Sequence, residues 1–259
     1  MPTLHYINTH LIQRYKEQQP ITLLKHFNKL KANGNSAERF NFYFANSAVY
    51  SSMIEGNRID FDSYLRYTES GMNKKGKSFT EIEDLKSAYG FAKSHTLTLK
   101  NLLAAHKKAT KTVLSEPKYR GAIRDKNVFI YSDGVKIYTG ASAEIVNKEV
   151  EKMFKDIETL LKADLSIAEV FYFASMLHLA FVKIHPFADG NGRMSRLLEK
   201  WFLASKLGEV AWYIQSERLY QKRLKSYYKN VHIGTDYTNI DYDCSLPFLL
   251  MLPMALRLK

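Results

Sequence analysis

The segment from residue 166 to residue 184, SIAEVFYFASMLHLAFVKI, constrains the fold of this chain more than any other. Ser166 and Glu169 have the spacing of a capping box, in which two side chains satisfy free backbone N–H groups at the start of a helix. The residues that follow are apolar on nearly every side, and a helix of that kind has to be buried. It is shorter than the run of about 20 apolar residues that a membrane span needs. We therefore predict a central helix with the rest of the chain packed around it.

Helical periodicity also dominates the remaining sequence, where three more segments carry apolar residues every three or four positions. These segments run from a Ser36 cap to a stop at Gly56, from a Thr80–Glu83 capping box to about Thr96, and onward from a Ser142 cap. The exception is residues 128–140, VFIYSDGVKIYTG, where β-branched and aromatic residues flank a Ser-Asp-Gly turn. The sequence predicts an all-α fold, a helical bundle with one small β-hairpin, and a mobile loop at residues 71–77.

Composition narrows the function classes. The chain has 259 residues, 46% of them hydrophobic, which suits one large domain, and a formal charge of +12 that favours anionic partners such as nucleotides. Much of the excess charge lies between Lys100 and Lys126. The single Cys244 cannot form an internal disulfide, and no apolar run at the N-terminus resembles a signal peptide, so we expect a soluble cytoplasmic protein with no membrane partner. The apolar C-terminal tail is expected to pack as a helix on the core or on a second subunit of a homo-oligomer.

The most informative segment is HPFADGNGRMSR, residues 185–196. Pro186 disfavours helical geometry at His185, so the buried helix is expected to end there and to turn into a loop. Gly190 and Gly192 let that loop adopt positive φ, and Asn191 between them tolerates the same conformations. A new helix follows. A glycine-rich loop that enters a helix directs free backbone N–H groups at one point, which makes it a binding site for an anion.

The charged residues of this segment fit a nucleotide. Arg193 and Arg196 are three positions apart on one helix face, where they can hold two phosphates of one polyphosphate. Arginine at a helix N-terminus opposes the helix dipole, which favours a ligand-binding role over a stabilising one. Asp189 offers a hard oxygen ligand suited to Mg²⁺, and His185 has a pKa range suited to accepting a proton near neutrality. Base, metal ligand, anion site and phosphate clamps therefore fall within one short segment.

These residues match the HxFx(D/E)GNGRxxR motif without departure, and in this the chain resembles the Fic family, enzymes that transfer AMP from ATP to protein hydroxyls. Gly192 favours the AMP-transferring branch, because the related phosphate-transferring Doc group has lysine at that place. The resemblance implies a Fic core at about residues 97–235, between an N-terminal helical region, 1–96, and a C-terminal helical tail, 236–259. Within the core, residues 128–140 resemble the family's flap hairpin.

The resemblance also implies a role for each residue. The roles are as follows: His185 deprotonates the target hydroxyl, Asp189 holds Mg²⁺ on the α- and β-phosphates of ATP, Gly190, Asn191 and Gly192 form the anion hole, Arg193 stabilises the departing pyrophosphate, and Arg196 holds the γ-phosphate. The flap residues Val128, Phe129 and Ile130 would pair with an extended segment of the target, which could be this protein itself. Tyr227 and Tyr228 lie where the family tends to place adenine contacts.

A second, shorter motif precedes the core. SSMIEGN, residues 51–57, fits the family's inhibitory pattern (S/T)xxxE(G/N) with Ser51, Glu55 and Gly56, in a helix expected at about residues 36–56. Ser51 and Glu55 share a helix face, and a glutamate at a helix C-terminus opposes the dipole and requires a cation. We predict that Glu55 pairs with Arg196 and thereby restrains ATP binding.

Other functions fit parts of the sequence. An enzyme of the same fold could transfer UMP or phosphocholine, or could mainly remove AMP from its target. A basic helical protein that binds nucleic acid is the non-enzymatic alternative, permitted by the cluster between Lys100 and Lys126. That alternative leaves the composition of residues 185–196 unexplained, so nucleic acid is the less favoured partner.

Overall fold

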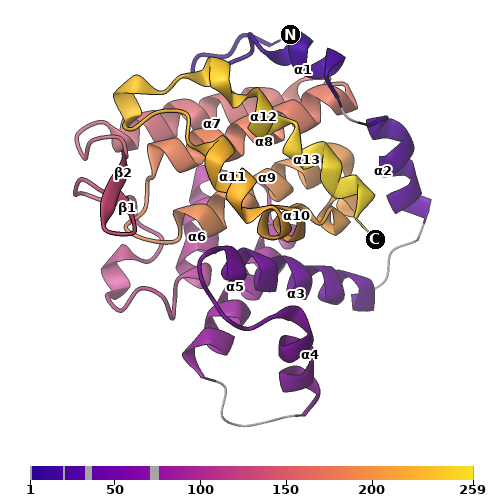
Figure 1. The fold of residues 1–259 in the computed structure, drawn as a ribbon, viewed down its shortest axis with the longest axis vertical. Coiled ribbons are helices and arrows are strands. Elements are labelled where there is room, and N and C mark those ends of the chain that lie inside the picture. Colours follow the sequence, from indigo (N-terminus) through magenta and orange to yellow (C-terminus); the bar gives the residue numbers. More distant parts are fainter. Residues whose placement is uncertain (1, 20, 33–36, 71–75, 259) are drawn as a thin grey trace.

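The computed structural model describes residues 2–19, 21–32, 37–70 and 76–258 and is almost wholly helical (Figure 1). The helices of the described residues are α1 (Ile12–Glu17), α2 (Leu23–Ala32), α3 (Ala37–Ile54), α4 (Phe61–Glu69), α5 (Lys77–Ser94), α6 (Leu99–Ala109), α7 (Val146–Lys162), α8 (Ile167–Ile184), α9 (Asn191–Leu207), α10 (Ser216–Lys222), α11 (Leu224–Val231), α12 (Leu246–Leu249) and α13 (Met251–Met254). Short 3-10 turns connect several of them. The predicted all-α class is confirmed.

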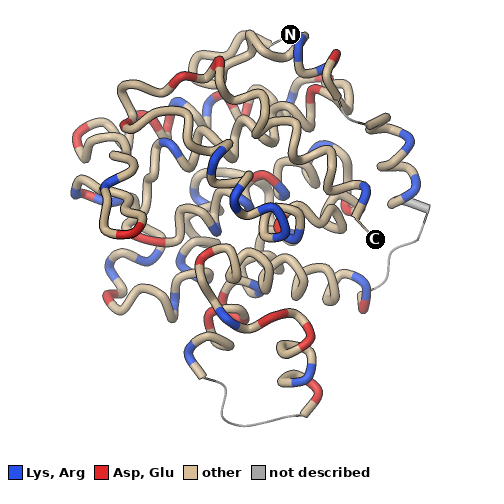
Figure 2. Tube along the Cα trace, viewed as in Figure 1, with Lys and Arg blue, Asp and Glu red and all other residues tan. Residues whose placement is uncertain are grey.

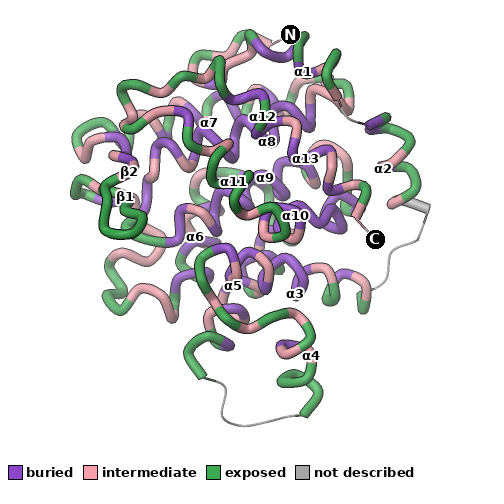
Figure 3. Tube along the Cα trace, in the orientation of Figure 1, coloured by how far each residue is buried: buried purple, intermediate pink, exposed green. Residues whose placement is uncertain are grey.

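Helices α8 and α9 form the centre of the molecule, and the other helices surround them (Figures 1 and 3). The capping box that opens α8 is present: the Ser166 side chain accepts from the Glu169 N–H, and the Glu169 carboxylate accepts from the Ser166 N–H at 2.8 Å. Contrary to the expectation from its length, α8 is long and apolar enough to cross a membrane, but 78% of it is buried inside the molecule. It is the predicted core helix.

Two of the other predicted helix starts are wrong. Helix α5 begins at Lys77 with Gly76 as its N-cap, and the Thr80 hydroxyl donates back to the Gly76 carbonyl from within the first turn. Helix α7 begins at Val146, because residues 142–145 form a turn in which the Val146 N–H donates to the Ser142 carbonyl. In both places the predicted cap lies within one helical turn of the observed helix start, because helix ends are less sharply determined by local sequence than helix interiors. The predicted cap at Ser36 and most of the predicted loop at 71–77 lie outside the described residues.

The predicted hairpin consists of strands β1 (Phe129–Ser132) and β2 (Val135–Thr139), paired antiparallel at one end of the bundle (Figure 1). Asp133 and Gly134 both have positive φ, 50° and 79°, which is the backbone that a two-residue hairpin turn requires. A bulge follows Ile130. The C-terminal tail packs on the core, as predicted, with Phe248, Leu249 and Leu252 fully buried.

Charge is spread unevenly over this frame. Exposed basic residues gather on α10 and α11 (Figure 2): Lys222, Arg223, Lys225 and Lys229. The basic residues between Lys100 and Lys126 are exposed or half-buried with one exception, Arg124, which is only 4% exposed. That exception belongs to the site described next.

Candidate active site

The loop between α8 and α9 reverses the chain at two positive φ angles. His185 ends α8 in the left-handed region at φ 55°, and Gly190 precedes α9 at φ 82°. Asn191, the first residue of α9, binds the backbone of Phe187 in the loop twice. Its Oδ1 accepts from the N–H and its Nδ2 donates to the carbonyl, both at 2.8 Å. Asn191 therefore closes the loop with its side chain, and its backbone N–H belongs to the first turn of α9, where such groups lack a partner within the helix.

Two buried residues that the sequence analysis did not single out hold this loop from outside. His106 on α6 donates from Nε2 to the Asp189 carbonyl at 2.9 Å, accepts the Gly121 N–H at Nδ1, and stacks on Phe187 with ring centroids 3.6 Å apart. Burial lowers the pKa of His106 to about 4, so the ring is neutral and keeps this tautomer. A lone histidine within a lysine-rich helix gives no signal of such a role.

Arg124 is the second support. Its Nε donates to the His185 carbonyl at 2.7 Å, its Nη1 donates to the Lys126 carbonyl at 2.7 Å, and its Nη2 donates to the Ala141 carbonyl. Its backbone N–H also donates to the Pro186 carbonyl at 2.9 Å. The guanidinium thus joins the end of α8 to both ends of the hairpin segment. Arg124 therefore has a structural role, whereas its basic sequence neighbourhood predicted an exposed charge that binds anionic partners.

His185 itself is half-buried and directs one ring nitrogen inward. Its Nδ1 lies 3.1 Å from the Val182 carbonyl, to which it can only donate, so Nε2 is left as the unprotonated nitrogen. Burial is the main cause that lowers the pKa of His185 to about 4. The imidazole is therefore neutral at physiological pH and can accept a proton, as a general base must.

Arg193 and Arg196 enter the core from the first turns of α9. Arg193 is 7% exposed, and within the described residues its Nε and Nη1 are buried without a hydrogen-bond partner. Buried donors of a cation are costly to leave unmatched, and native proteins seldom do so away from functional sites. The unmatched donors of Arg193 are therefore suited to binding an anion.

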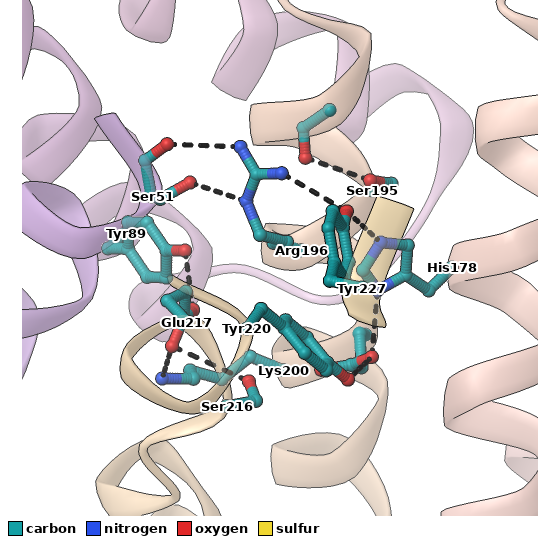
Figure 4. Close-up of polar contacts among 12 residues, drawn as sticks. Ser51, Tyr89, His178, Ser195, Arg196, Lys200, Ser216, Glu217, Tyr220 and Tyr227 are labelled. Atoms are coloured by element: carbon teal, nitrogen blue, oxygen red, sulfur yellow. Dashed lines mark hydrogen bonds and ion pairs between the residues drawn. The ribbon is translucent and has the colours of Figure 1, made fainter. Parts of the chain in front are cut away.

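Arg196, by contrast, is bonded to Ser51 and Tyr227 (Figure 4) and also to Glu55. Its Nε donates to the Ser51 hydroxyl at 2.8 Å, its Nη2 donates to the Ser51 carbonyl at 3.1 Å and to Glu55 Oε1 at 2.6 Å, and its Nη1 donates to the Tyr227 hydroxyl at 3.2 Å. The side chain is 1% exposed. The predicted pairing of Glu55 with Arg196 is present, and Ser51 of the same motif takes part in it.

The Glu55 carboxylate lies directly over the start of α9. A Cβ added at Gly192 would lie 2.3 Å from Glu55 Oε1 and 3.2 Å from Arg196 Nη1. Burial opposes ionisation of Glu55, but the charges of Arg196 and Arg193 outweigh it and lower the pKa of the carboxyl below its usual value. An ionised carboxylate thus lies beside the first turn of α9, where it is bonded to Arg196 and is also stabilised by the charge of Arg193, and Gly192 leaves room for it.

A second buried polar cluster fixes α3, the helix that Glu55 directly follows. Lys200 Nζ on α9 donates to Ser47 on α3 and to Glu217 on α10, both at 2.6 Å. The hydroxyl of Tyr89 on α5 donates to the other oxygen of Glu217 at 2.7 Å. The face that α3 turns toward α9 therefore carries Ser47, Ser51 and Glu55 at successive helical turns. Its polar contacts set the register in which Glu55 meets Arg196.

Asp189 is exposed at the edge of the loop, and its carboxylate accepts from the Gly190 N–H. Nowhere in the described ranges do three or more His, Cys, Asp or Glu side chains gather into a metal site. A divalent cation at Asp189 therefore needs most of its oxygen ligands from phosphates and water, which is the usual way in which Mg²⁺ binds with a nucleotide. The residues present fit that arrangement.

Comparison with known proteins identifies the core of the chain. A family model described as Fic/DOC family matches residues 96–203, which include the loop between α8 and α9. The region that holds the candidate site is therefore similar to the Fic/DOC family. It is 31% identical over 158 residues to the protein adenylyltransferase Fic of Nematostella vectensis, and 28% identical over 162 residues to the protein adenylyltransferase fic-1 of Caenorhabditis elegans. These matches cover 58% of this chain but only 35% and 30% of the relatives, so the chain spans about a third of their length.

Solved structures of Fic proteins share the fold over nearly the whole chain. A Fic family protein from Desulfovibrio desulfuricans G20 superposes with a TM-score of 0.71 at 20% identity, covering 98% of this chain and 74% of that protein. A Fic domain containing signaling protein from Bacteroides thetaiotaomicron gives a TM-score of 0.64 at 19% identity, covering 94% of this chain and 97% of that one. The shared architecture therefore includes α3, which lies outside the family match.

The hairpin lies beside the histidine. A Cβ added at Gly140 would lie 3.0 Å from His185 Cβ and 2.9 Å from Val128 Cγ1, so the base of the hairpin packs closely against the end of α8. Within the described residues β1 pairs only with β2, and its other edge is free. Phe129 on this strand is 47% exposed, while Val128 and Ile130 are half-buried. The role of these three residues in docking a target stays a prediction.

The two tyrosines predicted near the adenine have different surroundings. Tyr227 is 3% exposed and bonds His178 and Arg196 through its hydroxyl, so the prediction that it faces an adenine is wrong: the buried side of α11 takes it into the core. Tyr228 is 49% exposed, and its hydroxyl donates to the Ile54 carbonyl at 2.9 Å. It therefore holds the end of α3 next to Glu55, and its contact with adenine stays a prediction.

Proposed function

We propose that this protein transfers AMP from ATP to a Ser, Thr or Tyr hydroxyl of a protein, and that Glu55 restrains this reaction. The observation that carries the proposal is the pair of buried cations at the start of α9: Arg193 has unmatched donors, and Arg196 binds the Glu55 carboxylate. Both lie next to a neutral histidine whose Nε2 is free to accept a proton. The relatives named protein adenylyltransferase support the same reaction.

In the proposed reaction His185 Nε2 takes the proton of the target hydroxyl as its oxygen attacks the α-phosphorus of ATP. The bond from the α-phosphorus to the oxygen that bridges it to the β-phosphate breaks, and pyrophosphate leaves with that oxygen. Arg193 and the first N–H groups of α9 balance the negative charge, and Arg196 holds the γ-phosphate. Mg²⁺, held by Asp189 and the phosphates, would supply further charge neutralisation when bound. The free edge of β1 would present the target segment in line with the α-phosphate.

The test uses ATP labelled at one phosphate at a time. The Glu55→Gly variant, incubated with Mg²⁺ and cell lysate, is expected to incorporate label from the α-phosphate into protein bands, its own included, and none from the γ-phosphate. Mass spectrometry should then show an added AMP on a hydroxyl side chain. Incorporation from the γ-phosphate would identify a phosphate transfer instead, and label from UTP or a phosphocholine donor in preference to ATP would change the transferred group.

Tyr228 gives a milder test of the restraint. Tyr228→Phe removes the hydrogen bond to the Ile54 carbonyl but leaves the ring in place. One such bond at a partly exposed site is worth about 1 kcal/mol or less, so basal AMP transfer is expected to rise about two- to five-fold. Initial rates of label incorporation by wild type and variant measure the change. In the Glu55→Gly background the same substitution is expected to have no effect, and an equal rise there would assign Tyr228 a role other than holding α3.

A further inference from the structure

Behind Arg196 lies a line of buried polar side chains that the proposed reaction does not use (Figure 4). The Tyr227 hydroxyl on α11 lies 3.0 Å from His178 Nε2 on α8, and His178 Nδ1 lies 2.8 Å from Glu199 Oε2 on α9. The Tyr220 hydroxyl donates to the same oxygen of Glu199 at 2.8 Å. His178, Glu199 and Tyr220 have no exposed surface and Tyr227 is only 3% exposed, so the line is buried.

One arrangement of donors satisfies every hydrogen bond in this line. A guanidinium cannot accept, so Arg196 Nη1 donates to the Tyr227 oxygen, and the Tyr227 O–H is free to donate to His178 Nε2. His178 Nδ1 then carries the proton that Glu199 accepts. Each hydrogen bond orients the next group. A buried polar chain of this kind contributes little net stability compared with apolar packing, which points to a role in orientation.

We propose that Tyr227, His178 and Glu199 are positioning residues that keep Arg196 directed at the nucleotide once Glu55 has withdrawn. The inference rests on the proposed function, in which Arg196 holds the γ-phosphate. The inference is supported by the fact that Tyr227 and Glu55 bind different nitrogens of Arg196: Tyr227 binds Nη1, whereas Glu55 binds Nη2. A phosphate oxygen can therefore replace Glu55 at Nη2 while the bond from Nη1 persists and fixes the plane of the group.

The test compares ATP with ADP, which lacks the γ-phosphate. In the Glu55→Gly background, Tyr227→Phe is expected to weaken ATP binding about five- to ten-fold, the effect of one charge-assisted hydrogen bond, and to leave ADP binding unchanged. Calorimetric titration of both nucleotides with Mg²⁺ measures the ratio of affinities. The KM for ATP in AMP transfer is expected to rise with it, more than kcat falls. His178→Leu should act in the same direction, and His178→Gln, which can still donate and accept, should act less.

The matched control is Tyr172→Phe, which removes another buried tyrosine hydroxyl, bonded to the Asn8 carbonyl at 3.0 Å and remote from Arg196. It should leave the ATP-to-ADP ratio unaltered. An equal loss of ATP and ADP binding in Tyr227→Phe would mean that the line of polar side chains serves packing only. No loss of binding for either nucleotide would contradict the inference. Failure of the proposed function has a separate signature: Arg196→Ala in the same background would then leave the preference for ATP over ADP unchanged.

Discussion

Replacement of Glu55 by glycine is expected to raise AMP transfer about 30- to 150-fold. The ion pair at 2.6 Å keeps Nη2 of Arg196 occupied by a carboxylate, and that carboxylate fills the space over Gly192. A buried, hydrogen-bonded ion pair of this type corresponds to about 2 to 3 kcal/mol, which ATP no longer has to overcome in the variant. Each 1.4 kcal/mol changes the rate about tenfold. Initial rates of label incorporation from ATP measure the change.

The control for this variant is Glu38→Gly, which removes an exposed glutamate from the first turn of the same helix. It should leave the rate near that of wild type. Glu55→Gly is also expected to unfold at a lower temperature without ligand, because Arg196 loses its counter-charge, and to recover on addition of ATP with Mg²⁺. A rate in Glu55→Gly equal to that of wild type would exclude the restraint, whatever the unfolding temperature.

Replacement of His185 by alanine in the Glu55→Gly background is expected to lower kcat about 10²- to 10⁴-fold, the usual contribution of a general base. The side chain closes no ion pair, and its Nδ1 contact is to a carbonyl within its own helix, so the fold should persist. The measurement is kcat with ATP and Mg²⁺ at saturation. His10→Ala, at an exposed histidine, is the control. A His185→Ala enzyme that retained full kcat would rule out proton transfer to this residue.

The lowered pKa of His185 sets the pH range of this activity. Because the value is about 4, the base stays neutral through the range in which an ordinary histidine becomes protonated. Glu55→Gly also loses the carboxylate charge that raises this pKa, so its kcat/KM should not decline near pH 6.5 but only at about pH 4 or below. Stability has a matching dependence. His185 and His106 are both shifted down to about 4, so the unfolded chain binds more protons between pH 6.5 and 4. The stabilisation is complete above about pH 6.5 and is lost as the pH falls toward 4, which urea unfolding at several pH values will show.

Local sequence determined much of this protein. The capping box and apolar composition of residues 166–184 placed the core helix, and Asp133 with Gly134 formed the hairpin turn. The composition of residues 185–196 predicted an anion site. The motif of Ser51 and Glu55 predicted the ion pair with Arg196 that the structure contains. These features could be predicted because each depends on neighbours within a turn or two, or on a motif whose residues act at one point.

The supports of the site were decided only by the tertiary structure. His106 reaches the Asp189 carbonyl, Arg124 reaches the His185 carbonyl, and Tyr227 reaches Arg196, each across a long separation in sequence. A histidine in a basic helix, an arginine in a lysine-rich stretch and a tyrosine on an amphipathic helix look alike whether they face solvent or core. Their roles follow from packing, because a buried donor must find whichever acceptor the surrounding elements bring within about 3 Å.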